Sequence, residues 1–214
     1  MVRIRLWAIG IGEVREIFGA PSEVAAARLA ELTPPAVTSP RAPGLLGKLG
    51  PLLRRASDAP VIPADQPTRA DAEALLKGSF IVPNRLPAAW ALVTRWVGEQ
   101  AWGALEVRLD RDRVDFDLAR ARVSAHYSVS HLWHRDASLP LRPGPREEVG
   151  YLRHQNAVEL AAAWAEGLAE LDEGESRRDV QTIVDWLDQM PGWADSALAR
   201  QRPVPDLFAL AGPG

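Results

Sequence analysis

The sequence predicts one α+β domain, mainly helical, with a small antiparallel sheet that pairs the N-terminal and C-terminal strands. Residues 2–9 alternate between apolar and polar side chains, which is the period of a strand with one buried face. Residues 206–211 are a short apolar run suited to a buried strand, and they are the natural partner of the first strand. Between these ends, most segments repeat apolar residues at the spacing of amphipathic helices.

The first strand leads into two predicted helices. Its apolar face carries Val2, Ile4, Leu6 and Ala8, and its other face carries Arg3, Arg5 and Trp7. Residues 13–18 have the pattern of a short helix that ends at Gly19. Residues 21–32 predict a stronger helix, because Pro21 suits the first helical position and apolar residues recur every three or four positions.

Residues 33–67 are rich in proline and leave room for one brief helix, at residues 45–55. A connection of this length is uncommon inside a compact domain. We interpret it as an insertion or long loop within a single domain that spans residues 1–214, and not as a linker between two domains.

The middle of the chain predicts two helices and one ambiguous stretch. Thr68 or Asp71 caps a helix that runs to Leu76. Residues 85–100 form a longer helix with a wide apolar face, which indicates a central position. Residues 105–116 alternate like a strand at their start, whereas their second half could open a helix, so both alternatives stay open.

The last third of the chain predicts a helical pair. Residues 154–171 and 176–190 each place apolar side chains on one face, and Gly174 separates them, which indicates an antiparallel pair. Residues 192–200 add a further helical turn or two before the terminal strand.

The composition argues against several classes of function. A net charge of −3 gives no basic footprint for nucleic acid, and the absence of cysteine excludes disulfides, thiolate nucleophiles and cysteine-bound zinc. No apolar run is long enough for a signal peptide or approaches a membrane span of roughly 18 residues, so we expect a cytoplasmic protein without membrane partners. Arginine far outnumbers lysine, and alanine, leucine and proline are abundant, a bias typical of a GC-rich bacterium.

The layout of several segments resembles the YfbM-like group of small bacterial domains. These segments are the strand at residues 3–9 with its Gly12–Gly19 continuation, the stretch Glu148–Leu152 leading into the helix at 158–164, and the helical pair with the terminal strand. The resemblance covers about the first 32 and the last 65 residues, and the proline-rich middle departs from it. It implies an α+β fold, and it implies no role for any residue because the group brings no activity with it.

All four histidines fall within residues 126–154, and three of them lie in the stretch from His126 to Asp136. Histidine is the commonest metal ligand and titrates near neutral pH. On a helix only His131 and His134 would share a face, and on a strand His131 would face away from both others. No carboxylate stands at a recognised zinc spacing either. We therefore predict no metal site and interpret the segment as a polar rim.

Two other patterns fail as motifs. Residues 110–117 alternate aspartate and arginine but lack the sharp-turn glycine and the closing glutamate of a calcium loop. Gly10 and Gly12 follow a strand but lack the third glycine of a dinucleotide-binding turn. The sequence thus predicts no cofactor.

We expect a non-enzymatic binding or regulatory module that recognises a protein partner, including an immunity or antitoxin-like role. Tryptophan and arginine dominate the energetics of protein interfaces. The candidate surface comprises Arg3, Arg5, Trp7, His126, His131, Trp133, His134, Arg135 and Asp136. The alternative is a metal-dependent or acid–base enzyme that uses His126, His131 and His134, with Asp136 or an acidic residue from 110–117 completing the site.

Overall fold

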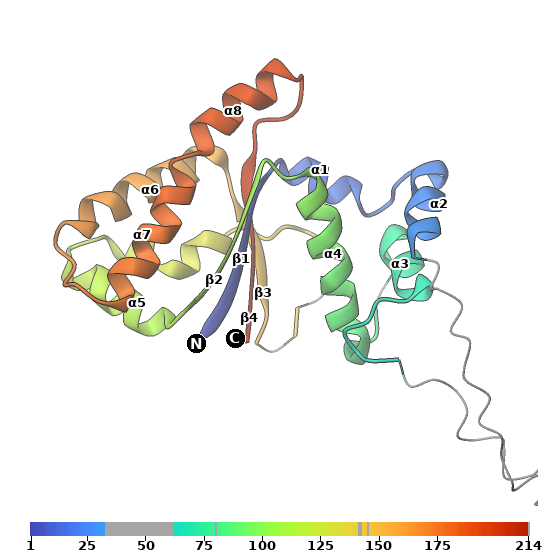
Figure 1. Cartoon of the computed structure of the whole chain (residues 1–214), viewed down its shortest axis with the longest axis horizontal. Coiled ribbons are helices and arrows are strands. Elements are labelled where there is room, and N and C mark those ends of the chain that lie inside the picture. The colour runs from blue at the N-terminus through green and yellow to red at the C-terminus, as the bar shows by residue number, and fades with distance from the viewer. Residues whose placement is uncertain (33–61, 80, 141–142, 145, 214) are drawn as a thin grey trace, which may run out of the picture.

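A four-stranded antiparallel sheet lies at the centre of the described residues, in the order β2-β1-β4-β3 (Figure 1). The computed structural model describes residues 1–32, 62–79, 81–140, 143–144 and 146–213. The strands are β1 (Val2–Ile9), β2 (Gly103–Leu109), β3 (Glu148–Leu152) and β4 (Asp206–Pro213). The α+β prediction is confirmed, and so is the pairing of the two terminal strands, whose register runs from Val2 opposite Pro213 to Ile9 opposite Asp206.

Helices cover both faces of the sheet (Figure 1). One face packs against α1 (Ile11–Glu16), α3 (Arg69–Leu76) and α4 (Leu86–Gln100), with α2 (Ser22–Glu31) outside them. The other face packs against α5 (Arg111–Arg120), α6 (His154–Leu168) and α7 (Glu175–Leu187), while α8 (Met190–Ala199) extends beyond one end of the sheet. Short 3-10 helices are η1 (Pro83–Arg85), η2 (Ala125–Tyr127) and η3 (Val129–Trp133).

The alternation of β1 divides the interior into two cores. Ile4 and Leu6 point into the core beneath α6 and α7, where Trp164 is fully buried. Trp7 points the other way, into the core beneath α4, where Trp96 is fully buried. The face assignment made from the sequence is therefore confirmed for these buried positions.

Two stretches differ from the sequence-based expectations. Residues 105–116, for which a strand and a helix were alternatives, contain the end of β2 and the start of α5, with Asp110 capping the helix through a bond from the Arg113 amide (3.2 Å). Residues 148–152, predicted as a lead into the next helix, form β3 instead. Their burial comes from pairing with β4 and from the η3 segment, contacts that no local pattern shows.

The proline-rich stretch is described only from residue 62 onward, so the brief helix expected at 45–55 lies outside the described residues. After it, α3 begins with a reciprocal cap. Thr68 accepts a hydrogen bond from the Asp71 amide (3.2 Å), and Asp71 accepts one from the Thr68 amide (2.8 Å). Burial alone would raise the pKa of Asp71, but hydrogen bonds from Arg85 and Thr68 outweigh it and leave that pKa below its usual value. Both candidate capping residues thus take part.

The predicted helical pair is confirmed, because α6 and α7 pack against each other. The helical turns expected at 192–200 belong to α8, which begins earlier, at Met190. Within the described ranges, every helix is too short or too polar to cross a lipid bilayer.

Candidate functional site

The side of the sheet that faces α4 carries an excess of arginine next to strand β2. Arg3 and Arg5 of β1 stand directly opposite Arg108 and Glu106 of β2. Residues directly opposite each other in an antiparallel pair project to the same side of the sheet. Arg3, Arg5, Arg108 and Glu106 are called the arginine face below.

A single carboxylate serves two of the three guanidinium groups of the arginine face. Glu106 lies 2.7 Å from an Arg3 nitrogen and 2.9 Å from Arg5 Nε. The hydrogen bond from Arg3, helped by one from Arg5, holds the pKa of Glu106 below its usual value. Arg108 is exposed, and no carboxylate of the described chain pairs with it. Three guanidinium groups and one carboxylate leave two positive charges unmatched.

The arginine face adjoins a groove of about 570 Å³ between the sheet and α4. Arg3 and Arg5 line it together with Trp90 and Thr94 of α4 and with Leu210 of β4. Arg5 also donates a hydrogen bond to the Thr94 hydroxyl (3.2 Å), which orients its guanidinium group at the groove wall. The groove thus offers apolar and cationic surface side by side.

Two carboxylates, those of Glu147 and Asp65, also line this groove. Glu147 immediately precedes β3, and β3 is separated from β1 by β4. Neighbouring strands are about 4.8 Å apart, so Glu147 lies well away from the β2 edge. Its carboxylate accepts hydrogen bonds from Trp90 Nε1 (2.8 Å) and from the Gly144 amide (2.9 Å). Asp65 is exposed. Glu147 thus lies on the β3 side of the groove, while Arg3 and Arg5 lie on the strand next to β2.

The histidine segment folds into short 3-10 helices, and its rings stack. The ring centroids of His126 and His131 are 4.4 Å apart, and those of His131 and His134 are 5.2 Å apart with planes only 24° from parallel. Residues three apart are eclipsed in a 3-10 helix, which explains the second pair. The segment adopts neither the α-helix nor the strand considered from the sequence. Within the described residues, no group of three His, Asp or Glu side chains could hold a metal ion.

His131 is the buried centre of this stack. It is 5% exposed, and its Nε2 atom is buried without a hydrogen-bond partner among the residues that the structure describes. Burial, together with the neighbouring His126 and His134, lowers the pKa of His131, so the ring is neutral at pH 7. The segment is held from α5, where the Asp115 carboxylate accepts a hydrogen bond from the Val129 amide (2.6 Å).

The structure divides the remaining predicted surface residues between the interior and the exterior. Trp7 is 3% exposed and stacks on Phe208 with ring centroids 5.6 Å apart, and Trp133 is 8% exposed. Contrary to prediction, neither tryptophan lies on the surface, because each completes a core. Arg135 and Asp136 are exposed, and the backbone of Arg135 pairs with Tyr151 of β3.

The predicted surface is also not continuous. Arg5 contacts α4 on one side of the sheet, whereas η3 contributes Trp133 to the core on the other side. The histidines and the arginine strand therefore do not form one site. Sequence reasoning missed Thr94, Glu106 and Arg108. Had residues 103–109 been assigned as a strand, their alternation would have placed Glu106 and Arg108 on one face.

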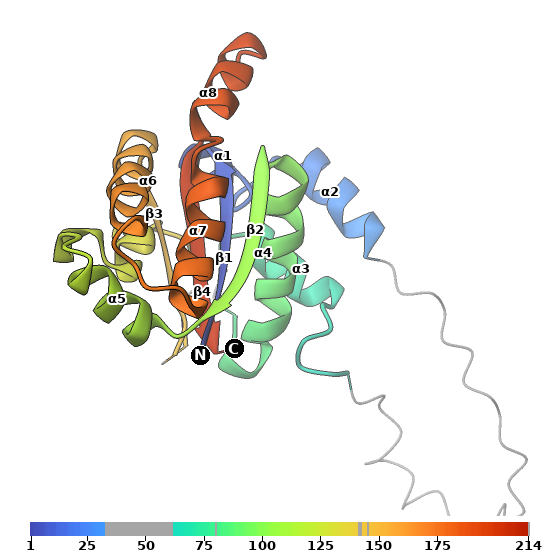
Figure 2. The same cartoon turned by 60° about the vertical axis from the view of Figure 1, so that its left-hand side comes forward.

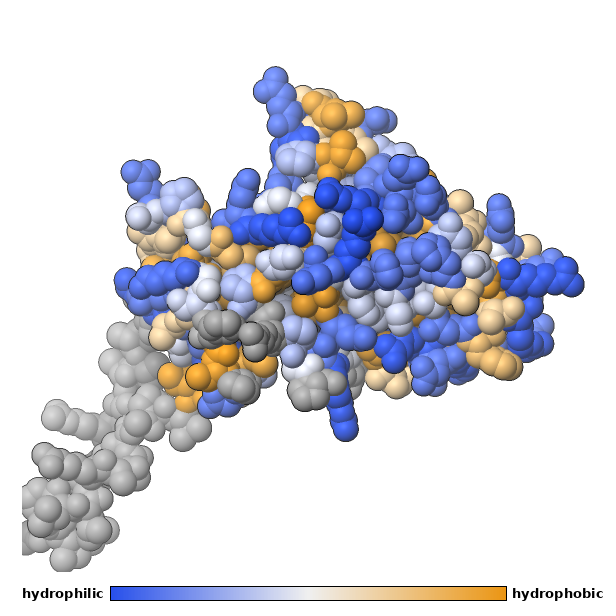
Figure 3. Space-filling model, turned by 180° about the vertical axis from the view of Figure 1, so that it is seen from behind, coloured by the Kyte–Doolittle hydropathy of each residue, from blue (hydrophilic) through white to orange (hydrophobic). Residues whose placement is uncertain are grey.

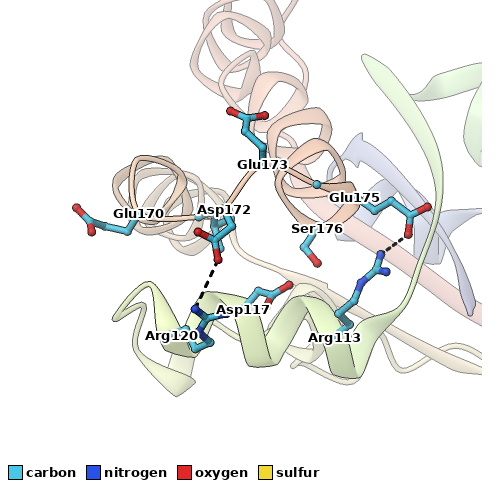
Figure 4. Close-up of a pocket in the computed structure, with 10 residues that line it drawn as sticks. Arg113, Asp117, Arg120, Glu170, Asp172, Glu173, Glu175 and Ser176 are labelled. Atoms are coloured by element: carbon cyan, nitrogen blue, oxygen red, sulfur yellow. Dashed lines mark hydrogen bonds and ion pairs between the residues drawn. The ribbon is translucent and has the colours of Figure 1, made fainter.

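A second hollow, of about 320 Å³, lies between α5 and the loop from α6 to α7 (Figure 4). Its arginines are matched by acidic partners, Arg113 by Glu175 at 2.7 Å and Arg120 by Asp172 at 3.5 Å. Ser176 points into this hollow (Figure 4). The two arginines of 110–117 thus pair with glutamates of other elements, Arg111 with Glu148 and Arg113 with Glu175.

The comparisons with known proteins identify a family and no individual relative. Neither the curated proteins nor the solved structures yield a match to the chain. The family described as "Domain of unknown function (DUF7691)" matches residues 2–208. Since that match runs from β1 into β4 and includes nearly the whole chain, the protein belongs to the DUF7691 family.

Proposed function

We propose that this protein is a non-enzymatic binding module and that its site is the arginine face. The single observation that carries the proposal is the unmatched charge: three guanidinium groups and one carboxylate share one patch of sheet. Arg3 and Arg108 stand directly opposite each other, an arrangement that costs stability. A carboxylate supplied by a ligand would remove that cost. The ligand class is therefore an acidic segment of a protein partner.

The arginine side chains are positioned to bind carboxylates strongly. Arg3 and Arg5 are only partly exposed, at 35% and 25% of their side-chain surface, and Arg3 Nε is buried without a hydrogen-bond partner in the described part of the chain. Guanidinium groups match carboxylates geometrically and form charge-assisted hydrogen bonds about twice as strong as neutral ones. Partial burial also weakens screening by salt. The face is thus better suited to binding than an ordinary exposed arginine pair.

The rest of the described surface supports recognition through charge. In Figure 3 hydrophilic residues are interspersed with small apolar patches over the face shown. The large apolar side chains that are exposed lie on separate elements, as Val24, Phe116 and Leu198 do. These exposed apolar side chains therefore do not form one broad apolar interface on the described surface.

The histidine-based enzyme receives less support from the geometry. A histidine that acts as a general acid or base must bring a ring nitrogen to the substrate. Nε2 of His131 is instead buried. Guanidinium groups do not exchange protons near neutral pH. The immunity or antitoxin-like role, the bacterial source, the cytoplasmic location and the relation to the YfbM-like group stay predictions.

Arg108→Gln is the variant that tests this function. The probe is a fluorescently labelled glutamate-rich peptide, titrated at low ionic strength and followed by anisotropy. We expect the variant to weaken binding about tenfold, the effect of losing roughly 1.4 kcal/mol of charge interaction. Its thermal stability should be unchanged or raised, since Arg108 has no ion pair with any described residue and opposes Arg3.

Arg69→Gln is the matched control, because it removes the same charge from an exposed position of α3. It should leave peptide affinity nearly unchanged. Equal losses in the two variants would show that only the overall charge of the protein matters, and no binding of the peptide by the unmodified protein would reject the proposal.

A further inference from the structure

The two edges of the sheet differ in how they are protected. Beside β3, the chain folds back so that Arg135 and Tyr151 exchange backbone hydrogen bonds of 3.2 and 2.9 Å, and η3 packs against the strand. Beside β2, no described segment forms such a pair. In Figure 2 no ribbon crosses in front of β2. One edge is therefore closed by the protein itself, and the other is open along the described chain.

An open edge is a template for another strand. Alternate backbone N–H and C=O groups of an edge strand point outward without a partner, and proteins usually blunt such edges by cover, proline, bulges or short length. β2 runs for seven residues without proline, and it pairs with β1 in an unbroken register from Leu109 to Gly103. Its first residue is crowded, since a Cβ on Gly103 would lie 2.3 Å from the Trp193 ring.

The side chains of β2 specify what kind of strand fits. On the arginine face, Arg108 is exposed and has no ion pair within the described chain, while the carboxylate of Glu106 is already paired with Arg3 and Arg5. On the opposite face, Leu105 and Val107 are half-buried apolar residues beside α7. Directly opposite residues of paired strands contact each other. A strand in which acidic and apolar residues alternate would therefore complement both faces of β2.

We infer that the β2 edge is an addition site for an extended segment of a partner protein in which acidic and apolar residues alternate. This rests on the proposed function, because the acidic residues of the segment would meet the unmatched charge of the arginine face. The backbone of the segment pairs with β2, its carboxylates face Arg108 and the neighbouring Arg3, and its apolar side chains cover Val107 and Leu105.

A second copy of this chain fits the edge poorly. Antiparallel pairing of two β2 strands centred on Val107 would place Arg108 of each copy opposite Glu106 of the other. That carboxylate already pairs with Arg3 and Arg5, so a second copy adds no free carboxylate and each arginine face keeps its two unmatched positive charges. The charge excess therefore selects an acidic partner over self-association.

The experiment separates backbone pairing from charge attraction. The probe is a capped peptide of alternating glutamate and valine, matching the seven residues of β2, prepared unmodified and in two N-methylated forms. One form is methylated at every glutamate and the other at every valine. Because only one set of alternate amides can pair with β2, we expect one methylated form to lose at least about tenfold in affinity and the other to bind nearly like the unmodified peptide.

Any other result contradicts the proposal that a strand is added at the β2 edge. If both methylated forms bind like the unmodified peptide, or both lose affinity equally, no strand is added to β2. If those forms bind equally and Arg108→Gln still weakens binding, the proposed function stands while the edge site fails. Failure of the unmodified peptide to bind rejects both. A dimer in sedimentation experiments that the peptide dissociates would assign the edge to a second copy instead.

Discussion

His131 shows how burial changes the chemistry of one residue in this protein. Its ring is enclosed between His126 and His134, and burial is the main reason that its pKa lies below the usual value. The unfolded chain takes up a proton at this site near pH 6.5, whereas the folded protein does so only at lower pH. In that interval the unfolded state binds more protons, so stability falls as the pH falls.

His131→Gln tests this linkage. We expect urea unfolding of the unmodified protein to show a loss of stability between about pH 7 and pH 5, and the variant to show a smaller loss. For one proton the difference between the slopes is at most about 1.4 kcal/mol per pH unit. His154→Asn changes a histidine outside the stack and serves as the control. Equal pH dependence in the unmodified protein and in His131→Gln would contradict a neutral buried ring.

At the scale of elements, a glycine in β3 determines how the histidine segment is placed. A Cβ atom on Gly150 would lie 2.2 Å from the carbonyl oxygen of Trp133 and 2.6 Å from that of Arg135. Both are backbone atoms, so they cannot yield without moving the whole segment. Glycine inside a strand often marks such a close approach of another backbone.

Gly150→Ala is therefore expected to destabilise the fold by about 1–3 kcal/mol, the usual cost of forcing extra volume into a packed site. It should also increase the reactivity of His131 toward diethyl pyrocarbonate, because the segment separates from β3. Urea unfolding and mass spectrometry measure the two effects. Gly12→Ala is the control, since nothing lies within 4 Å of its added Cβ. A stable variant with a protected His131 would be inconsistent with this packing.

At the scale of the whole molecule, β4 joins the two cores. Leu207 and Phe208 are adjacent and fully buried, but Leu207 faces the core of α6 and α7 while Phe208 faces the core of α4. The strand also lies between β1 and β3. Loss of packing on either side therefore weakens the sheet on which the other core depends.

Leu207→Ala and Phe208→Ala test whether the cores unfold together. We expect losses of about 2–5 and 3–5 kcal/mol respectively, the usual costs of such truncations. In both variants, circular dichroism and tryptophan fluorescence should report one coincident transition. Leu198→Ala, at an exposed position of α8, should have little effect. Separate transitions for the two signals would mean that the cores are independent.

Local sequence patterns were sufficient to predict a helix or strand wherever that element has one buried face. The alternation of β1 and the helical spacing in α4, α6 and α7 predicted these elements and much of their buried sides. The predicted site was less accurate. Arg3 and Arg5 belong to the site proposed here, but Trp7 is covered by Phe208 and α4, and Trp133 is covered by its own core. A tryptophan that the local pattern places on the surface can be covered by residues far away in the sequence, and the local pattern does not show those contacts.

The sequence by itself determined the α+β class, the pairing of the chain ends, the sides of β1 and the arginine content of its second face, because each follows from local periodicity and residue type. Only the tertiary structure decided that β2 lies at an open edge, that its Arg108 stands opposite Arg3, and that the histidines stack around a buried ring. Those features depend on strand order, register and 3-10 geometry. Each arises from contacts between segments far apart in the chain or from turns without a strong periodic pattern.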